Sequence, residues 1–416
     1  MIRKLQVSNF KGFRSISIEP AKLNLIIGAN GTGKTNFADL IDFLAVASRL
    51  GLKAALEKYG GLGEVRTKLP GAGRPPALAC TVEIADEPYR GIDSLTYSFA
   101  LSRSGEVGVD SENLRATVFA RAPGRPGRDQ KVKYDLSRKL SLSIMREGSN
   151  IREWEAGPLD NPQEFDDEEN LILNAYGKLN PFQTVAEYIG SMRAFNIDAA
   201  LAKVSHNGGD TELERDGSNL IPFLKRIIET EKLYEKFLED LRSAVPYVDT
   251  ITPERILSYT TLKFSERDSK LEFRAQQMSD GTIRLLGLVA VLQNSPPLPV
   301  VVIEEPENAL HAYAIRTLVE IARRVSSADK FPTQVFFTSH SPAVVDELLS
   351  LESQRERAIQ AFVTKRRDGA NIMEPAPAEV IKAIANNLGR PSDFLREGSF
   401  EDGPQLELFD ASSETV

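Results

Sequence analysis

Cysteine, histidine and tryptophan are scarce in this sequence of 416 residues, which contains one, three and one of them. The lone cysteine, Cys80, excludes an intrachain disulfide and favours a reducing compartment. No stretch approaches the ~20 consecutive apolar residues that cross a bilayer, and Met1–Phe10 lacks the apolar core of a signal peptide. These absences predict a soluble cytoplasmic protein that does not enter a membrane.

Basic residues are outnumbered as well, since 51 lysines and arginines face 59 aspartates and glutamates for a net charge of −8. Duplex nucleic acid carries one negative charge per ~1.7 Å, so the chain as a whole is not attracted to it. One segment differs. Its eight basic residues are Arg115, Arg121, Arg125, Arg128, Lys131, Lys133, Arg138 and Lys139, against the two acids Asp129 and Asp135. A DNA contact through this basic strip, Arg115–Lys139, and a solvated hairpin are both compatible with the pattern.

Short apolar stretches alternate with helically spaced ones along most of the chain, as in an α/β protein. Strands are predicted at residues 2–7, 16–18, 23–27, 251–274, 300–303 and 334–338, an antiparallel sheet at 78–142, helices at 36–50, 281–293 and 312–326, and a mostly helical stretch at 170–244, clearest at 220–241. No heptad pattern persists over three or four repeats, which excludes long coiled-coil arms.

A glycine-rich loop follows the apolar run at residues 23–27 and opens the predicted helix at 36–50. Its G-x-x-x-x-G-K-T pattern consists of Gly28, Ala29, Asn30, Gly31, Thr32, Gly33, Lys34 and Thr35. In such a loop the backbone N–H groups surround a triphosphate, the lysine reaches the β- and γ-phosphates, and the threonine ligates Mg²⁺. The pattern and its context predict an ATP and Mg²⁺ site rather than a chance glycine-rich turn.

Two carboxylates, Glu304 and Glu305, end the apolar strand at residues 300–303. Glu304 is expected beside the Mg²⁺, and Glu305 is expected to polarise the attacking water. Glu304 stands where many phosphate-loop enzymes carry aspartate, so contact through a metal-bound water is as compatible as direct ligation. An acidic strand end alone more often marks a solvated loop, but the phosphate loop about 270 residues upstream favours the catalytic interpretation.

A serine and a histidine mark two further strand and helix boundaries. Ser279, with Gly281 two residues later, precedes the predicted helix at 281–293, where a serine alone is the signal of an N-cap. His340 follows the predicted strand at 334–338, and a lone histidine is usually structural. A place at the same site for both is implied by the resemblance described next.

These motifs, in this order and spacing, resemble the ABC-type ATPase heads related to the recombination-protein-F and SMC proteins and to the overcoming-lysogenisation-defect (OLD) ATPases. The turn Asn9–Phe13 adds to the resemblance, since such heads begin with an N-F-K-x-F turn beside the nucleotide, which implies a cofactor-binding role for Lys11. Asn36, directly after the loop, is assigned to the same site. Gln183 is a candidate for the glutamine loop of such heads, but equally a plain helix residue.

The resemblance implies an α/β fold: a P-loop ABC-type ATPase head with a mixed-sheet lobe, an antiparallel β lobe and a helical lobe. We expect the head at residues 1–395, with a β-rich lobe at 1–170, a helical lobe at 171–250, and the serine, acidic and histidine motifs at 251–395. The remaining residues, 396–416, are predicted to be an acidic, disordered tail apart from a short stretch at 406–409, because the residues after Arg396 contain six acidic and no basic side chains.

The resemblance also implies roles that are shared between two copies. Ser279 and Gly281 cap the γ-phosphate of nucleotide held by the opposite subunit, while His340 senses the γ-phosphate. His311 belongs to the dimer contact, and His206 is an ordinary loop residue. ATP is then expected to close a homodimer or a higher assembly head to tail, and hydrolysis to reopen it.

Two functions remain open at this point. The first is an ATP-gated switch in DNA repair or prokaryotic anti-phage defence, and the second is a regulatory or scaffolding ATPase that holds and releases a separate effector, such as a nuclease or toxin. A transporter subunit is disfavoured because no membrane-coupling segment is encoded. An intrinsic nuclease of the OLD kind is disfavoured because the 74 residues after Pro342 contain no Asp-x-Asp pair.

Overall fold

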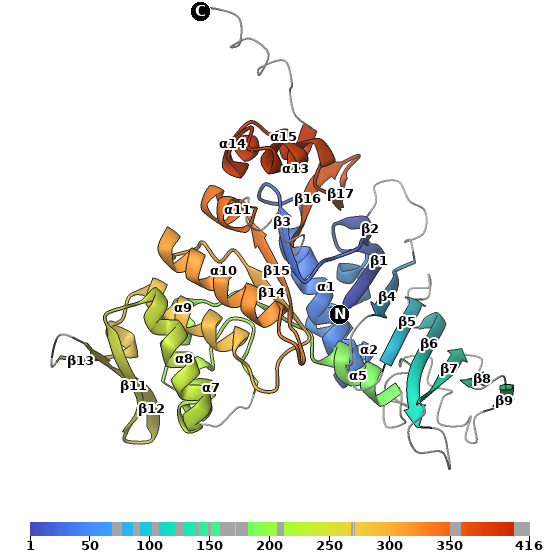
Figure 1. The fold of residues 1–416 in the computed structure, drawn as a ribbon, viewed down its shortest axis with the longest axis horizontal. Coiled ribbons are helices and arrows are strands. Elements are labelled where there is room, and N and C mark those ends of the chain that lie inside the picture. The colour runs from blue at the N-terminus through green and yellow to red at the C-terminus, as the bar shows by residue number, and fades with distance from the viewer. Residues whose placement is uncertain are drawn as a thin grey trace, which may run out of the picture.

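The fold of the chain is taken from a computed structural model (Figure 1). It describes residues 1–68, 77–85, 92–101, 108–121, 129–137, 141–148, 151–158, 171, 182–205, 212–267, 269, 271–349 and 359–402.

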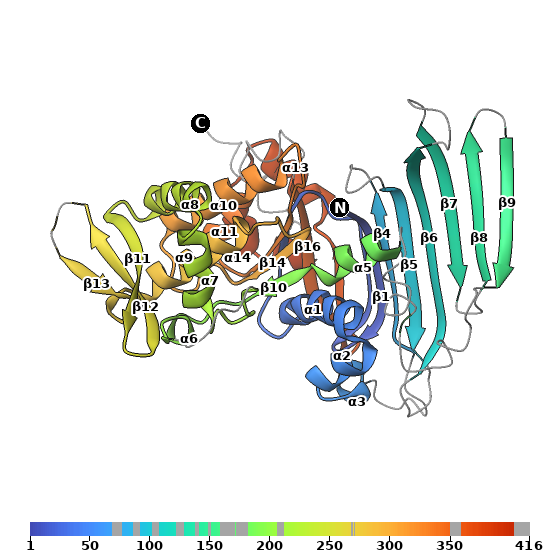
Figure 2. The same ribbon diagram turned by 90° about the horizontal axis from the view of Figure 1, so that it is seen from below.

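One long mixed sheet runs through the molecule and has 14 strands among the described residues. In spatial order they are β10 (Arg193–Phe195), β14 (Val300–Glu304), β15 (Gln334–Ser339), β3 (Leu23–Ile27), β16 (Ile359–Arg367), β17 (Ala370–Pro375), β2 (Phe13–Ile18), β1 (Ile2–Phe10), β4 (Ala79–Ala85), β5 (Ile92–Leu101), β6 (Val109–Arg121), β7 (Asp129–Ser137), β8 (Ser141–Gly148) and β9 (Ile151–Pro158). A smaller antiparallel sheet contains β11 (Val248–Ile256), β12 (Tyr259–Glu266) and β13 (Glu272–Arg274). Figure 2 shows the small sheet at one end of the molecule and β9, the last strand of the large sheet, at the other.

The first five strands of the large sheet, β10 to β16, are parallel. Their register places Glu304 of β14 opposite Thr338 of β15, and Ser339 of β15 opposite Ile27 of β3. The carboxyl ends of parallel strands lie at one edge of a sheet, where α/β proteins bind ligands. Motifs that are hundreds of residues apart in the sequence therefore meet at this edge.

Helices cover both faces of the parallel part (Figures 1 and 2). On one face lie α1 (Lys34–Leu50), α2 (Leu52–Lys58), α3 (Leu62–Val65) and α5 (Phe182–Gly190); on the other lie α6 (Ala199–Ala202), α7 (Leu220–Ile228), α8 (Glu231–Ala244), α9 (Asp280–Leu292), α10 (Ala312–Ser326), α11 (Pro342–Leu348), α13 (Ala378–Ala385), α14 (Pro391–Arg396) and α15 (Ser399–Asp402). A strand covered on both faces must be apolar on both. In β3, Leu23, Leu25 and Ile27 pack into one core and Ile26 into the other.

Most predicted elements are confirmed, and the helix at 312–326 and the strand at 23–27 have the predicted bounds. The structure differs from the predicted elements in three places. The short strand β10 interrupts the stretch predicted as mostly helical. The amphipathic segment 220–241 is two helices that break at Thr230, whose hydroxyl donates to the carbonyl of Arg226 (3.1 Å). The antiparallel strands from β4 onward continue the large sheet through β1, and they extend to Pro158.

The C-terminal part contributes more than was predicted. Strands β16 and β17 are inserted between β3 and β2, so the sheet is completed by residues 359–375. The prediction of disorder is wrong for Ser399–Asp402, which form α15 and bury Phe400 in the core. Residues 403–416, including the stretch at 406–409, lie outside the described residues. Among the described helices, none is long and apolar enough to span a bilayer.

The side chain of Gln334, at the start of β15, connects this strand to the N-terminal part of the chain. Its amide accepts from the Ile2 N–H (2.9 Å) and donates to the carbonyls of Ile2 (3.0 Å) and Ala21 (2.8 Å), and only 1% of the residue is exposed. Gln334→Leu should lower the free energy of unfolding by about 2–4 kcal/mol, because each buried polar group left unpaired costs roughly 1–3 kcal/mol. Urea unfolding followed by circular dichroism measures this.

Gln183→Leu is the matched control, since this glutamine is exposed on α5. It should change stability by no more than about 0.5 kcal/mol. Equal effects of the two substitutions would contradict the structural role of Gln334.

Candidate nucleotide-binding site

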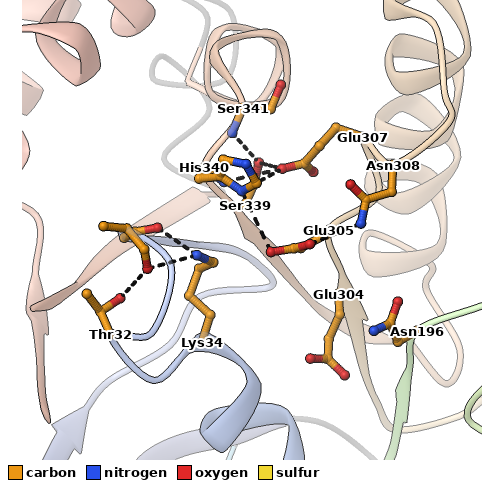
Figure 3. Close-up of polar contacts among 12 residues, drawn as sticks. Thr32, Lys34, Asn196, Glu304, Glu305, Glu307, Asn308, Ser339, His340 and Ser341 are labelled. Carbon is orange, nitrogen blue, oxygen red and sulfur yellow. Dashed lines mark hydrogen bonds and ion pairs between the residues drawn. The ribbon is translucent and has the colours of Figure 1, made fainter.

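The phosphate loop connects β3 to α1 at the carboxyl edge of the sheet (Figure 3). Lys34 is 5% exposed, and its ammonium group donates to the loop carbonyls of Gly28 (2.7 Å) and Ala29 (3.1 Å). Burial lowers the pKa of Lys34, while the charges of Glu305 and Glu307 act in the opposite direction. The lysine is thus held inside the loop, close to the carboxylates from β14.

Two positions in the loop accept only glycine. A Cβ atom on Gly28 would lie 2.2 Å from Oγ1 of Thr364 and 2.6 Å from Oγ1 of Thr32. Gly33 has a φ of 109°, in the region that favours glycine. Thr364 lies on β16, and its hydroxyl is 2.8 Å from that of Thr32 and donates to the carbonyl of Ile27 (3.2 Å). The sequence analysis missed Thr364, because no local pattern connects β16 with the loop.

Glu304 and Glu305 point in different directions from the end of β14 (Figure 3). Glu304 is 2% exposed, and the Thr35 hydroxyl lies beside its carboxylate. Burial raises the pKa of Glu304, and the guanidinium of Arg215 opposes this shift. Glu305 has a φ of 44°, which is uncommon for any residue other than glycine, and its N–H donates to the carbonyl of Thr338 (2.9 Å).

The predicted histidine lies beside these acids. Nδ1 of His340 is 3.7 Å from Oε1 of Glu305 and 3.5 Å from Oε1 of Glu307. Glu307 also accepts from the hydroxyl of Ser339 (2.8 Å), and Asn308 donates to Glu305 (3.0 Å). The structure therefore brings the phosphate loop, both acidic residues and His340 together, and adds Glu307 and Asn308, which the sequence analysis did not assign.

Within one chain, Ser279 is an N-cap. Its hydroxyl accepts from the N–H of Thr282 (3.1 Å) at the start of α9. Gly281 packs against the loop that follows β14, since a Cβ atom there would lie 2.3 Å from the carbonyl oxygen of Ala309. These contacts lie within one chain, so the predicted role of Ser279 and Gly281 at the nucleotide of a second subunit stays a prediction.

Arg284 joins α9 to the acidic end of β14. Its guanidinium donates to the carbonyls of Glu304 and Glu305, at 3.0 Å each, and lies 3.3 Å from Oδ1 of Asn196. Burial lowers the pKa of Arg284, and the nearby carboxylates oppose this. Asn196 directly follows β10 and lies next to Glu304 in Figure 3, so the edge strand also supplies a polar side chain. The sequence analysis missed both.

A chain of alternating charges leads away from Glu304. Lys11 pairs with Asp39, Asp39 with Arg215, and Arg215 with Glu304. Burial lowers the pKa of Arg215, but the carboxylates of Glu304 and Asp39 outweigh it and hold the pKa above its ordinary value. Lys11 also lies 4.4 Å from the ring centre of Tyr59. Asn36, in the first turn of α1, lies beside the Gly12 turn, as the resemblance implies for this region.

The other predicted residues lie elsewhere or outside the described residues. Gln183 is exposed in the first turn of α5, where its amide donates to Glu187 (2.8 Å). His311 is the exposed residue before α10, and His206 is outside the described residues. The basic strip falls on β6, β7 and the segments after them. Its register pairs Arg115 with Asp135 and Arg121 with Asp129, and Arg125, Arg128, Arg138 and Lys139 lie outside the described residues.

The donors beside Thr35 suit Mg²⁺. The Thr35 hydroxyl lies beside the Glu304 carboxylate and acts to lower its pKa, and Mg²⁺ prefers oxygen ligands from one or two protein groups together with phosphates and waters. These two residues therefore fit the metal that accompanies a bound triphosphate.

The contact between Gly281 and Ala309 gives a stability prediction for this site. Gly281→Ala should push the loop away, because overpacking costs about 1–3 kcal/mol. The N–H groups of Asn308 and Leu310, which bond within that loop (3.1 Å each), should exchange with deuterium roughly tenfold faster or more, since ~1.4 kcal/mol corresponds to a factor of ten. Hydrogen exchange with mass spectrometry measures this. Gly63→Ala, where a Cβ atom meets nothing within 4 Å, should change neither amide.

Comparison with known proteins places the chain among nucleotide-binding proteins. A family model described as "AAA domain, putative AbiEii toxin, Type IV TA system" matches residues 23–346. An OLD nuclease of Thermus scotoductus is 23% identical over 98% of this chain and 70% of its own length. An ATP/GTP phosphatase of Helicobacter pylori is 22% identical over 88% of this chain and 93% of its own.

Solved structures of SMC heads are also similar. The head domain from Pyrococcus furiosus, bound to the C-terminal domain of ScpA, is 15% identical with a TM-score of 0.47, and covers 93% of this chain and 99% of that one. Because the family model matches well over half of the residues, the chain belongs to the family of AAA domains described as putative AbiEii toxins, and it is a P-loop ATPase of the ABC/AAA type related to the OLD proteins.

Proposed function

We propose that the protein binds Mg²⁺·ATP at this site, hydrolyses it, and uses binding and hydrolysis to close and reopen a dimer of identical chains. The observation that carries the proposal is the meeting of Lys34, Thr35, Glu304, Glu305 and His340 at one edge of the sheet. Each of these side chains has a role in phosphoryl transfer from ATP to water.

Within one chain, the position of each of these residues suits it to a different role. Lys34 leaves the carbonyls of Gly28 and Ala29 and binds the β- and γ-phosphates, while the loop N–H groups bind the remaining oxygens. Thr35 and Glu304 hold Mg²⁺, which when bound neutralises charge that develops on the phosphates.

Glu305 orients the attacking water and accepts its proton, since its carboxylate is partly exposed at the mouth of the site. Asn308 holds one oxygen of Glu305, and His340 lies near the other. His340 donates to the γ-phosphate and registers its loss after hydrolysis.

We infer closure of two copies because the phosphate loop of one chain contacts the triphosphate from one side only. The loop supplies donors from one side of the triphosphate, and the N-terminus of a helix such as α9 supplies further donors and a favourable dipole. Two chains related by a two-fold axis complete both sites at once if Ser279 and Gly281 of each reach the nucleotide of the other.

For the biological role, we favour a switch in DNA repair or anti-phage defence, since one relative is named an OLD nuclease. The alternative is a regulatory ATPase that holds and releases a separate effector, and the toxin–antitoxin words in the family description favour it. A nuclease or toxin gene beside this one would select the alternative. A DNA contact through Arg115–Lys139 stays a prediction, and the strand register there pairs Arg115 with Asp135 and Arg121 with Asp129.

Glu305→Gln should reduce ATP turnover by about 10²–10⁴-fold, the usual contribution of a general base. The affinity for ATP should change by less than about threefold, because the phosphate loop is intact. Steady-state hydrolysis and equilibrium binding of a fluorescent ATP analogue measure the two effects.

Two variants serve as references for Glu305→Gln. Lys34→Ala should lose binding itself, and Glu272→Gln on the small sheet should leave hydrolysis unchanged. Turnover by Glu305→Gln above about a tenth of the native rate would count against Glu305 as the base.

ATP should also drive association of the Glu305→Gln protein, which retains the nucleotide. Adding Ser279→Arg should prevent closure by its bulk, while nucleotide binding through Lys34 persists. Light scattering and small-angle X-ray scattering, each with and without ATP, measure this. Ser94→Arg on β5 is the control for an exposed serine and should not prevent closure. Identical masses and scattering profiles with and without ATP would contradict the shared-site mechanism.

A further inference from the structure

A short segment, Glu212–Arg215, is attached to α1 at two places. Glu212 pairs with Arg49 near the end of α1 (2.6 Å) and with Arg193 of β10 (2.8 Å). Arg215 pairs with Asp39 of α1 and with Glu304 of β14. The segment thus carries an arginine from outside the phosphate-loop motif to the acidic end of β14.

The backbone of this segment fixes the direction of the arginine. The carbonyl of Arg215 accepts from the N–H of Asn196 (2.8 Å), and the carbonyl of Asp216 accepts from the N–H of Asp198 (2.8 Å). These bonds attach the chain at Arg215 and Asp216 to the residues that directly follow β10. Arg215 is therefore presented by a chain segment that is bonded to the sheet, and its side chain is only 25% exposed.

The guanidinium of Arg215 lies between Asp39 of α1 and Glu304 of β14. Thr35 and Asp39 lie four residues apart on the same face of α1, which puts Asp39 about 6 Å further along the helix axis. Arg215 uses Nη1 for Oδ1 of Asp39, and both Nε (3.1 Å) and Nη2 for one oxygen of Glu304, Oε1. Thr35 lies beside the same carboxylate, on the side of the phosphate loop.

The contacts of Arg215 are those of a group that orients neighbouring carboxylates. Asp39 and Glu304 are both buried, at 8% and 2% exposed, so their charges need partners. A forked guanidinium that binds two carboxylates at once fixes their separation, which a lysine cannot do. Partners of this kind orient the groups that contact a metal, and losing them typically weakens metal affinity 10–100-fold.

We propose that Arg215 is a positioning residue that holds the Glu304 carboxylate in the orientation needed to receive the Mg²⁺ of Mg²⁺·ATP beside Thr35. The inference rests on the Mg²⁺·ATP site proposed above and extends it to a residue outside the phosphate-loop and acidic motifs. The role assigned to Arg215 is exerted through Glu304, to which its guanidinium is bonded.

The test separates nucleotide binding from its dependence on Mg²⁺. Binding of a fluorescent, non-hydrolysable ATP analogue is measured in EDTA and across a Mg²⁺ titration, for the native protein and Arg215→Met. We expect the affinity in EDTA to change by less than about twofold, because Lys34 and the loop backbone are untouched. The Mg²⁺ concentration for half-maximal tightening should rise by about tenfold or more.

Two further variants separate the effect of the Arg215 guanidinium from the effect of the ion pairs that attach the segment Glu212–Arg215. Glu212→Gln removes the other ion pairs of Glu212–Arg215 and should leave the Mg²⁺ titration unchanged. Arg215→Lys keeps the charge but reaches only one carboxylate, so it should recover part of the loss. Circular dichroism verifies that each variant is folded, and Arg215→Lys tests the inference if Arg215→Met is not.

Three results would overturn the inference while leaving the Mg²⁺·ATP site in place: an unchanged Mg²⁺ requirement in Arg215→Met, a lower one, which would mean that Arg215 competes with the metal, or equal shifts in Arg215→Met and Glu212→Gln. If the native protein binds the analogue equally well in EDTA and in Mg²⁺, the proposed Mg²⁺ site itself fails, and this inference fails with it.

Discussion

The site depends on the parallel alignment of β3, β14 and β15, because their hydrogen-bonded register brings segments that are far apart in the sequence to one edge. The register sets Ile27 level with Ser339, and Thr338 level with Glu304. The loop or acid after each strand consequently emerges at one edge. A slip of one residue would turn every side chain of a strand to the other face. The register between β3 and β15 is supported by Asn24, whose buried amide donates to the carbonyl of Val335 (3.2 Å).

Around this edge, burial and charge are balanced locally. Glu304 and Asp39 lose hydration on folding, and Arg215 and Lys11 compensate them. Arg284 performs a different task, because it binds two main-chain carbonyls of the acidic strand end and comes from α9. Together with the close approach of Gly281 to Ala309, this makes α9 and the end of β14 one packed unit. A displacement of α9 has to break these bonds or carry Glu305 along.

The sequence predicted the parts of the site that are written as contiguous motifs. Lys34, Glu304, Glu305 and His340 each stand in a run of residues whose pattern identifies them, and the structure brings them together. Arg215, Arg284, Asn196 and Thr364 could not be found this way, since each is a single residue whose partner lies 20 to 332 residues away. The same limit applies to β10, which has three residues and so no measurable period. Strands β16 and β17 were missed because the motifs end before them.

The support of Gly28 and Thr32 by Thr364 has a consequence for how the protein is made. The two threonines are 332 residues apart. At a translation rate of ~5–20 residues per second, roughly 20–60 s pass between their emergence from the ribosome. During that interval the phosphate loop exists without the strand that braces it. We therefore expect the phosphate loop to reach its final shape, and to bind nucleotide at full strength, only after β16 has been made and added to the sheet.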